Sequence, residues 1–585
     1  MALPRLHSPA SPATSTAPHL TEAEASVAEA VEVYHRTYTT LLRSSGEMRL
    51  RVLEMSHKAM NASLHPLAAS ADLDLGAFLY AVRRLPETLM TAQRVVMGQS
   101  AEVFARQGYA ALESWRELSA PGRRRRWYDD GEGTLAVLIA SASDVDDLVP
   151  TLVAFQIEWN KLHTRLVAAG WDKPLAASPD ATECAATLGG QEDDWAQLIE
   201  VWGAEFGACL AQVARREMSL RLRMLGGTQV GYARVTRSWW DQVQDVQRRH
   251  GLLDRPLYFV SSNSHSLVNL VSGIAQQREA ELVEFVRNFG PPDLREELQR
   301  FREGRTEGDW NNFLYYAARL WFRSVSGDSP AHQERRELEQ RLGIHHVSSR
   351  GALDVAAQVI SLSTLDPQRF DPRLGSVDPA ALRASRAVIV NIDYPLGLAA
   401  YNILREIAET AGELRGVYIL GKAATLNADV GDVMLSNVIH DEHSGSTYWL
   451  DNVFTVNDIA PWLRFGSGLD NQRAVTVKGT FLQNHGYLDF YYREAFTVVE
   501  MEAGPYCAAV YELSESGRYP TGEPVNFSKL PIDLGVIHYA SDTPFTQART
   551  LGARGLSYFG MDSTYAASVA IMRRVLKLEG ALRDA

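Results

Sequence analysis

The sequence predicts an α/β protein. A mixed or largely parallel sheet flanked by helices is expected in the C-terminal part, preceded by a largely helical N-terminal region with a few α/β strands. Two observations support this fold class. After residue 385, strand-like apolar runs follow one another closely, and helical segments separate several of them. Before residue 365, apolar residues recur mainly at three- and four-residue spacing, the period of an amphipathic helix.

The composition excludes several classes of protein. Hydrophobic residues make up 46% and charged residues 22% of the 585 positions, which is typical of a globular chain. The formal net charge of -13 argues against a dominant nucleic-acid-binding surface. No apolar run approaches the ~20 residues that span a bilayer. We therefore expect neither nucleic acid nor a membrane as a partner.

The cysteines and the N-terminal residues indicate in which cellular compartment the protein is expected. Cys184, Cys209 and Cys507 are far apart and form no CxxC pair, so the sequence predicts neither a disulfide framework nor a zinc site. This usage fits a reducing cytoplasm. Residues 1–20 are rich in Pro, Ser and Ala and lack the apolar region of a secretory signal. We interpret them as a disordered tail, with a transit peptide as the alternative.

Residues 21–125 are predicted to form a helical bundle, because Val27, Val31 and Tyr34 recur at helical spacing. Consecutive arginines follow at 123–126. Such a run usually lies in a solvated loop, and phosphate binding is the alternative.

The region 126–365 is predicted to be mostly helical α/β structure that could contribute strands to the C-terminal sheet. The apolar runs 135–140 and 257–260 are strand candidates, each followed by a polar turn. After the first run, Ser143 or Asp144 is expected to cap a helix.

The turn after the second run contains His265. Polar turns at the carboxyl ends of strands are where open α/β sheets bind ligands, although a lone histidine more often has a structural role.

A proline-rich linker is predicted at 366–384, followed by the strand-rich domain 385–585. Its strand candidates are 387–393, 416–420, 432–439, 474–482, 495–502 and 534–541.

The stretch GVYILGKAATLNADVGD, residues 416–432, nearly matches the phosphate-binding P-loop pattern G-x-x-x-x-G-K-[ST], with Ala423 in place of Ser or Thr. A P-loop curls its backbone amides around phosphates, whereas the apolar residues 417–420 favour a buried strand. We therefore interpret the stretch as a core strand followed by a ligand-facing turn at 421–424, where Gly421 allows close approach.

Carboxylates occur at the ends of two predicted strands. In VVEMEAGPY, Glu500 and Glu502 would lie on one side of an extended chain with Met501 opposite, and could accept hydrogen bonds from a diol such as ribose. In VIHYASD, Ser541 and Asp542 end another strand, where a partly buried aspartate could donate a proton. The alternatives are solvent-facing acids and a helix cap.

Four stretches together resemble the nucleoside phosphorylase and nucleosidase superfamily: NIDYPLGLAA, VYILGKAATLNADVGDVMLSNVIHDE, VVEMEAG and IHYASD. The resemblance covers 385–585, and the order of these short motifs at strand ends makes the combination specific. It implies a phosphorylase-like mixed sheet, cleavage of the N-glycosidic bond of a purine nucleoside or nucleotide, and a homo-oligomer.

The resemblance also implies residue roles. Glu502 would hold the ribose hydroxyls, with Met501 packing on the sugar and Glu500 assisting. Asp542, beside Ser541, would protonate the leaving base. This chemistry is coherent, because breaking a glycosidic bond passes through an oxocarbenium-like transition state.

The attacking water or phosphate would be positioned by Asp393 and its turn, and by Gly421, Lys422 and Ala423. Family phosphorylases use arginines to bind phosphate, but none stands in NIDYPLGLAA or GKAATL. Lys422 could substitute as a cationic anchor, with Arg405 more distant, so hydrolysis and phosphorolysis both stay open.

The arginine run 123–126 or His265 would reach this site if the strands beside them joined the sheet. No cofactor is expected, with phosphate as a possible co-substrate. The spacing in the cluster 440–443 is poor for a metal, so we expect His440 to contact substrate or a subunit, and no metal. The alternative functions are a non-catalytic nucleotide-binding or regulatory protein with a helical assembly region, and a P-loop phosphohydrolase.

Overall fold

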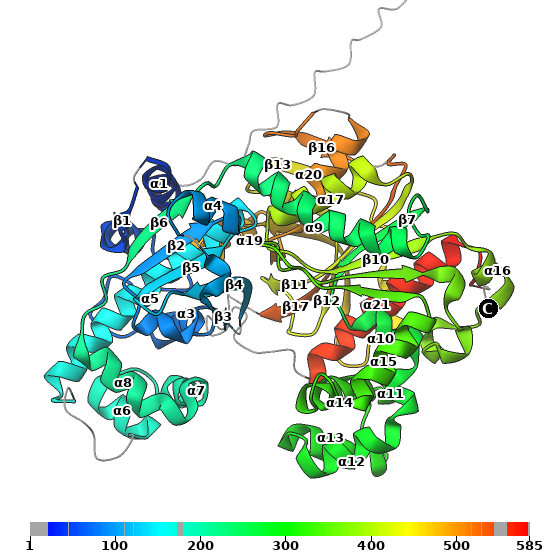
Figure 1. Ribbon diagram of the computed structural model, residues 1–585, viewed down its shortest axis with the longest axis horizontal. Helices are drawn as coiled ribbons and strands as arrows, with labels where there is room; N and C mark the ends of the chain where they lie inside the picture. The colour runs from blue at the N-terminus through cyan, green and yellow to red at the C-terminus, as the bar shows by residue number, and fades with distance from the viewer. Residues whose placement is uncertain are drawn as a thin grey trace, which may run out of the picture.

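The computed structural model describes residues 22–44, 46–109, 111–120, 122–171, 179–515, 518–527, 529–542 and 558–582. They form two α/β units side by side, the N-terminal one in blue and cyan and the larger C-terminal one in green to red (Figure 1). The predicted tail, residues 1–20, lies outside the described residues. None of the helices among the described residues is long and apolar enough to cross a membrane.

The N-terminal unit is built on a six-stranded sheet with the order β1-β6-β2-β5-β4-β3. Its central strands β6, β2 and β5 are parallel, and β4 and β3 continue the sheet in antiparallel pairing. The strands are β1 (Met48–Arg49), β2 (Arg94–Gly98), β3 (Arg116–Ala120), β4 (Arg123–Asp129), β5 (Thr134–Leu138) and β6 (Arg221–Leu225).

This sheet differs from the helical bundle predicted for 21–125. Helices α1 (Glu22–Ser44), α2 (Glu54–Ala59), α3 (Leu75–Val82) and α4 (Ala101–Arg106) are present, but strands lie between them. The reason is visible in β2, where Val95, Val96 and Met97 are all fully buried and pack into clusters on both faces of the sheet. A short apolar run of this kind suits a strand covered on both sides.

The arginine run is also not the solvated loop that the sequence predicts, because it forms strand β4. Side chains alternate between the two faces of a strand, so neighbouring arginines have different surroundings. Arg125 is buried and forms ion pairs with Asp144 (Nε–Oδ1 2.8 Å) and Asp147 (Nη2–Oδ2 2.7 Å). Arg124 points toward the C-terminal unit.

The long helix α5 (Ala142–Ala168) covers this sheet and begins at the capping box of Ser141 and Asp144. Asp144 accepts backbone hydrogen bonds from Ala140 (2.7 Å) and Ser141 (3.1 Å), as expected for a helix cap. Three further helices pack beside α5 as a lobe: α6 (Ala181–Leu188), α7 (Glu192–Trp202) and α8 (Phe206–Arg215). Helix α9 (Gln229–Arg249) then leads to the C-terminal unit and packs on α17.

The C-terminal unit contains an eleven-stranded sheet. Strands β10, β7, β11 and β17 are parallel neighbours. Strands β11, β15, β14, β12 and β17 pair in a closed ring, a five-stranded barrel. The strands are β7 (Leu257–Ser262), β8 (Ile344–Val347), β9 (Ala357–Ser361), β10 (Val388–Asp393), β11 (Leu414–Thr425), β12 (Val433–Asp441), β13 (Ser446–Trp449), β14 (Gly468–Thr476), β15 (Val498–Glu500), β16 (Pro524–Asn526) and β17 (Asp533–Asp542).

The sheet draws on more of the chain than 385–585. Strand β7, from the run 257–260, lies between β10 and β11, and β8 and β9 extend the same sheet. Strand β5, from the run 135–140, belongs to the N-terminal sheet instead. The segment 366–384 contains short helices, among them α16 (Pro379–Ala384), and buries Leu374 and Leu382. Its prolines begin these turns.

Helices cover both faces of this sheet (Figure 1). One core joins α9, α17 (Ala399–Thr410) and α20 (Ala503–Ser514), which pack on one face. A second core joins α21 (Tyr558–Leu578) with the helices that separate β7 from β8. These are α10 (Ser266–Ser272), α11 (Ile274–Gln277), α12 (Glu279–Phe289), α13 (Pro292–Arg302), α14 (Trp310–Ser324) and α15 (Pro330–Arg341).

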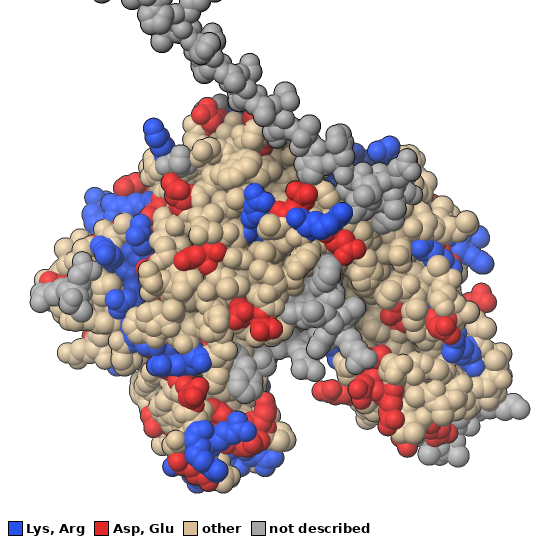
Figure 2. Space-filling model, turned by 180° about the vertical axis from the view of Figure 1, so that it is seen from behind, with Lys and Arg blue, Asp and Glu red and all other residues tan. Residues whose placement is uncertain are grey.

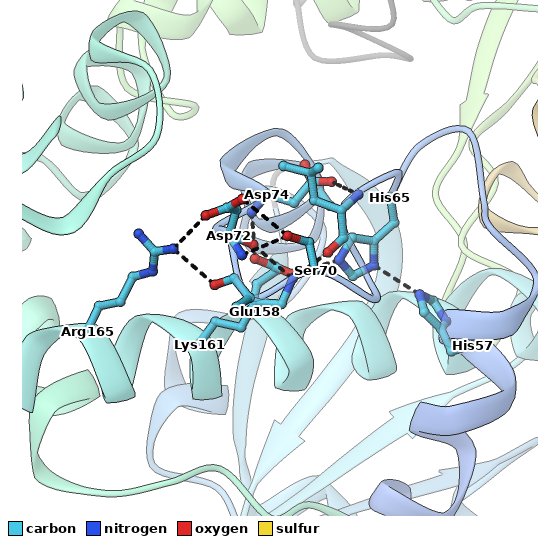
Figure 3. Close-up of polar contacts among 11 residues, drawn as sticks. His57, His65, Ser70, Asp72, Asp74, Glu158, Lys161 and Arg165 are labelled. Carbon is cyan, nitrogen blue, oxygen red and sulfur yellow. Dashed lines mark hydrogen bonds and ion pairs between the residues drawn. The ribbon is translucent and has the colours of Figure 1, made fainter.

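A buried polar network lies inside the N-terminal unit (Figure 3). His57 Nε2 lies 3.0 Å from His65 Nδ1, and His65 Nε2 lies 2.8 Å from Glu158 Oε1. Lys161 Nζ also pairs with Glu158 at 2.6 Å. Phe481 of the C-terminal unit packs against both histidine rings. The core of the N-terminal unit thus includes Phe481 and Leu482 from the segment after β14, and neighbouring residues of this segment line the cavity described next.

Candidate functional site

A cavity of about 1230 Å³ lies between the two units. Its floor is formed at the carboxyl ends of β7, β10 and β15 and by the end of β11, and α14 and α15 form another wall. In Figure 2, which views the molecule from behind, the two helical lobes at the lower edge are separated by a hollow. Ligands of open α/β sheets bind at such strand ends, so this cavity is the candidate site.

Asp393, the last residue of β10, lines this cavity together with the turn that follows it. Its carboxylate forms an ion pair with Arg124 of the N-terminal unit (Nη1–Oδ2 2.6 Å). Arg124 also donates a hydrogen bond to the backbone oxygen of Tyr394 (2.6 Å). One arginine therefore holds both the side chain and the backbone at the end of β10.

Three segments meet at Gly397 in the same turn. Glu502 Oε1 accepts a hydrogen bond from Gly397 N (3.2 Å), and Ser143 Oγ accepts one from Leu398 N (2.9 Å). Gly397 has a φ of +51°, and a Cβ atom there would lie 2.3 Å from Ser143 Oγ. Only glycine fits without displacing the N-terminal unit. Ser143, expected as a helix cap, therefore also contacts this turn.

Glu502 and Met501 are half-buried and line the cavity. Strand β15 ends at Glu500, and Glu502 is the residue before helix α20, with φ -123° and ψ -28°. The chain is therefore not extended through Glu502, and the alternation expected for Glu500 and Glu502 does not apply. The turn carries Glu502 toward Gly397.

Glu500 is almost fully buried and supports this turn. It accepts hydrogen bonds from the backbone N–H groups of Glu502 (2.6 Å) and Ala503 (2.7 Å), and the hydroxyl of Thr476 contacts its other oxygen. Burial, and then the nearby charge of Glu502, raise the pKa of Glu500 to about 8. Burial lowers the pKa of His538, 3.8 Å from Glu500, to about 4. Both shifts favour neutral side chains near pH 7.

The predicted turn at 421–424 is instead part of β11, which runs on to Thr425. It stays in strand conformation because β17 pairs with it as far as Ala424, across an irregularity after Ala423. Lys422 and Ala423 line the cavity, and Ser541 Oγ lies 3.3 Å from Ala423 O. Gly421 is half-buried in the strand beside His538. A strand cannot curl around phosphates, so this geometry is incompatible with a P-loop.

Asp542 is the last residue of β17, and its Cα is paired with that of Ala424. Its side chain lies outside the described part of the structure. The neighbouring Ser541 lines the cavity, so the backbone brings this strand end to the same place as Asp393 and Glu502.

His440 lies on β12, outside the residues that line the cavity. Its Nδ1 lies 3.0 Å from Thr447 Oγ1, and burial lowers its pKa. In the same cluster, Asp441 accepts hydrogen bonds within its own turn and Glu442 accepts one from Tyr491 (2.6 Å).

Arg405, on α17, pairs with Glu409 (3.0 Å). Across the described ranges, no group of three or more His, Cys, Asp and Glu side chains is placed to hold a metal ion.

Several cavity residues carry no motif in the sequence. The charged helices around 275–345 are typical of a solvated surface, yet they supply Arg319, Arg323 and Arg335 to the cavity wall. The available signal was the four-residue spacing of Arg319 and Arg323, which places both on one face of α14. His265 also lines the cavity, with Nδ1 3.3 Å from the hydroxyl of Tyr565.

Similar solved structures include nucleoside-cleaving enzymes. A 5'-methylthioadenosine/S-adenosylhomocysteine nucleosidase from Neisseria meningitidis is 14% identical, with a TM-score of 0.27 over 42% of this chain and 95% of that chain. The enzyme of the same name from Campylobacter jejuni is 12% identical, with a TM-score of 0.28 over 42% of this chain and 95% of that chain. A uridine phosphorylase from Schistosoma mansoni is 9% identical, with a TM-score of 0.28 over 58% of this chain and 92% of that chain. These scores are too low to establish a shared fold.

The remaining comparisons concern sequence families. No curated protein matches the chain. Residues 50–577, which span both α/β units and the cavity between them, match a family described as "Family of unknown function (DUF6909)". The chain belongs to this family.

Proposed function

We propose that the protein cleaves the N-glycosidic bond of a nucleoside or nucleotide, with a purine as the base. The observation that carries this proposal is the approach of Glu502 to the turn after Asp393, inside one cavity (Glu502 Oε1–Gly397 N 3.2 Å). The two carboxylates, Asp393 after β10 and Glu502 after β15, line the same cavity and supply a group that can hold a sugar diol and a group that can orient an attacking water.

The reaction needs three functions around an oxocarbenium-like transition state. Glu502 accepts hydrogen bonds from the ribose hydroxyls, and Met501 packs against the sugar. Asp542, next to Ser541, protonates the leaving base, which then departs as a neutral molecule. Asp393 orients the water that attacks the anomeric carbon, and Arg124 holds this carboxylate in position through their ion pair.

Other residues have supporting roles in this scheme. Glu500 holds the turn that places Glu502, through its hydrogen bonds to the backbone of residues 502 and 503. Lys422 and Ala423 line the cavity from β11, which pairs with β15 beside Glu502, and Gly421 precedes them on the same strand. Lys422 offers a cation for a phosphate co-substrate, so the scheme serves hydrolysis and phosphorolysis alike. His440 acts outside this cavity, at a subunit contact.

The test is the release of free base by the purified full-length protein. Adenosine, inosine, uridine and their 5'-monophosphates would be incubated with and without inorganic phosphate, and the bases separated by chromatography. We expect a purine substrate to be cleaved, and Glu502→Gln to reduce kcat/KM about 10- to 100-fold, because hydrogen bonds to a charged group are lost. Dependence on phosphate would indicate phosphorolysis.

The matched control is Glu515→Gln, at the exposed far end of helix α20. It removes the same charge and should leave kcat/KM within about two-fold of the unchanged protein. If no substrate releases base while nucleotides still bind the folded protein, the non-catalytic nucleotide-binding function replaces this proposal.

A further inference from the structure

Helix α14 presents two arginines to the cavity. Arg319 and Arg323 are four residues apart, so they lie one turn apart on the same face of the helix. Arg319 is half-buried, and Arg323 is exposed at the wall. Arg335 of helix α15 joins them, with its guanidinium 4.9 Å from the centre of the Phe322 ring.

These arginines differ in how their charge is balanced. Arg335 pairs with Glu339 (Nε–Oε1 2.8 Å), as Arg124 pairs with Asp393 elsewhere in the cavity. Within the part of the chain that the structure describes, the side chains of Arg319 and Arg323 form no ion pair or hydrogen bond. Two like charges at this spacing repel each other, and partial burial of Arg319 adds a desolvation cost. An anionic ligand would compensate for both.

The pair lies close to the strand ends of the candidate site. All three arginines line the same cavity as His265, in the turn after β7, and as Asp393 and Tyr394 at the end of β10. Burial, and then the charges of these arginines, lower the pKa of His265 to about 3. The arginines therefore face the same ligand space as Asp393.

The size of the cavity leaves room for more than a nucleoside. Its volume of about 1230 Å³ exceeds the roughly 300–1,000 Å³ of most small-molecule sites. A guanidinium is planar and donates several hydrogen bonds, which suits bidentate contact with phosphate oxygens. Two guanidiniums that have no carboxylate partner among the described residues, on the wall near the strand ends, are suited to a phosphate dianion.

We propose that Arg319 and Arg323, with Arg335 beside them, form a phosphate subsite, and that the cavity takes a nucleotide whose phosphate group binds there. The identity of the rest of the ligand rests on the proposed function. Inorganic phosphate has the same chemistry, and the experiment below separates the two sources.

The test compares the full-length protein with the double variant Arg319→Gln/Arg323→Gln. The control is Arg336→Gln/Arg341→Gln, which removes two exposed charges from α15 outside the cavity lining. AMP and adenosine are the probes, each with and without inorganic phosphate. Base release gives kcat/KM, and calorimetric titration gives the Kd of each probe.

With AMP, we expect kcat/KM and affinity of the cavity variant to fall about 100-fold, because charged hydrogen bonds to phosphate are removed. With adenosine, which has no phosphate, its kcat/KM and Kd should stay within about two-fold of the values of the unchanged protein. The control should match the unchanged protein with both probes. If instead the loss appears only in phosphate-stimulated cleavage of adenosine, the same subsite holds inorganic phosphate.

If the cavity variant and the control have equal kcat/KM and Kd for both AMP and adenosine, with and without inorganic phosphate, the phosphate subsite is overturned. Failure of the proposed function has a different signature. In that case no base is released by any protein, and the titrations alone decide: AMP binding that is weakened only in the cavity variant retains the subsite without catalysis.

Discussion

Arg124 in the N-terminal sheet and Asp393 at the end of β10 in the C-terminal sheet form an ion pair of 2.6 Å between the two units, on the lining of the cavity. The same guanidinium holds the backbone oxygen of Tyr394, 270 positions away in the chain. The N-terminal unit therefore contributes directly to the geometry of the candidate site.

Replacing Arg124 with glutamine should impair activity more than stability. The pair is partly solvated, with side-chain exposures of 42% and 20%, so its loss should change the free energy of unfolding by less than about 1 kcal/mol. Asp393 would lose its orientation, and we expect kcat to fall about 10-fold. The measurements are steady-state kinetics and urea unfolding. Arg116→Gln, which breaks an exposed pair with Asp129, is the control. Equal activity in the two variants would contradict the positioning role.

Replacing Arg125 with alanine should instead impair stability more than activity. This side chain is 3% exposed and neutralises both Asp144 and Asp147, so its removal leaves two buried carboxylates without their cation. We expect the free energy of unfolding to fall by about 3–5 kcal/mol. Urea unfolding monitored by circular dichroism measures it, and Arg124→Ala on the same strand serves as the comparison. A cost similar to that of Arg124→Ala would show that the buried pairs contribute little.

Glu500 predicts a pH dependence of stability. Its pKa is raised to about 8 in the folded protein, against about 4.3 for an unfolded glutamate. Between these values the folded state binds the extra proton, so this contribution is fully present below about pH 4 and is lost as pH rises through 8. The unfolding free energy of the unchanged protein minus that of Glu500→Gln should therefore fall steadily from pH 5 to about pH 8 and level off above it. A constant difference over this range would mean that Glu500 is charged in the folded state.

Asp542 is predicted to be the residue whose loss most affects turnover. If it protonates the leaving base, Asp542→Asn should lower kcat about 10²- to 10⁴-fold while changing KM little, because asparagine cannot donate that proton in the transition state. Substrates with a leaving group that needs no protonation, such as p-nitrophenyl riboside, should be much less affected. The same loss with both kinds of substrate would assign Asp542 another role.

Much of the local structure could be predicted from the sequence. The run 417–420 is a buried strand, the run 257–260 is another, and Asp144 caps its helix, because these depend on the apolar and capping preferences of neighbouring residues. The sequence also predicts the strand that ends at Asp393 and a strand that contains Val498–Glu500, for the same reason, although the second strand ends before Glu502.

The tertiary structure decided the rest, because it depends on pairing between distant segments. Residues 421–424 stay in a strand because β17 and β15 close the barrel around them. The arginine run is a strand because β3 and β5 pair with it, and that pairing sends Arg125 inward and Arg124 toward Asp393. The sequence by itself determined that the runs 257–260 and 417–420 form buried strands and that carboxylates such as Asp393 and Asp542 stand at strand ends. Which cations meet those carboxylates was decided only by the packing of two units, since ion pairs between residues hundreds of positions apart leave no local pattern in the sequence.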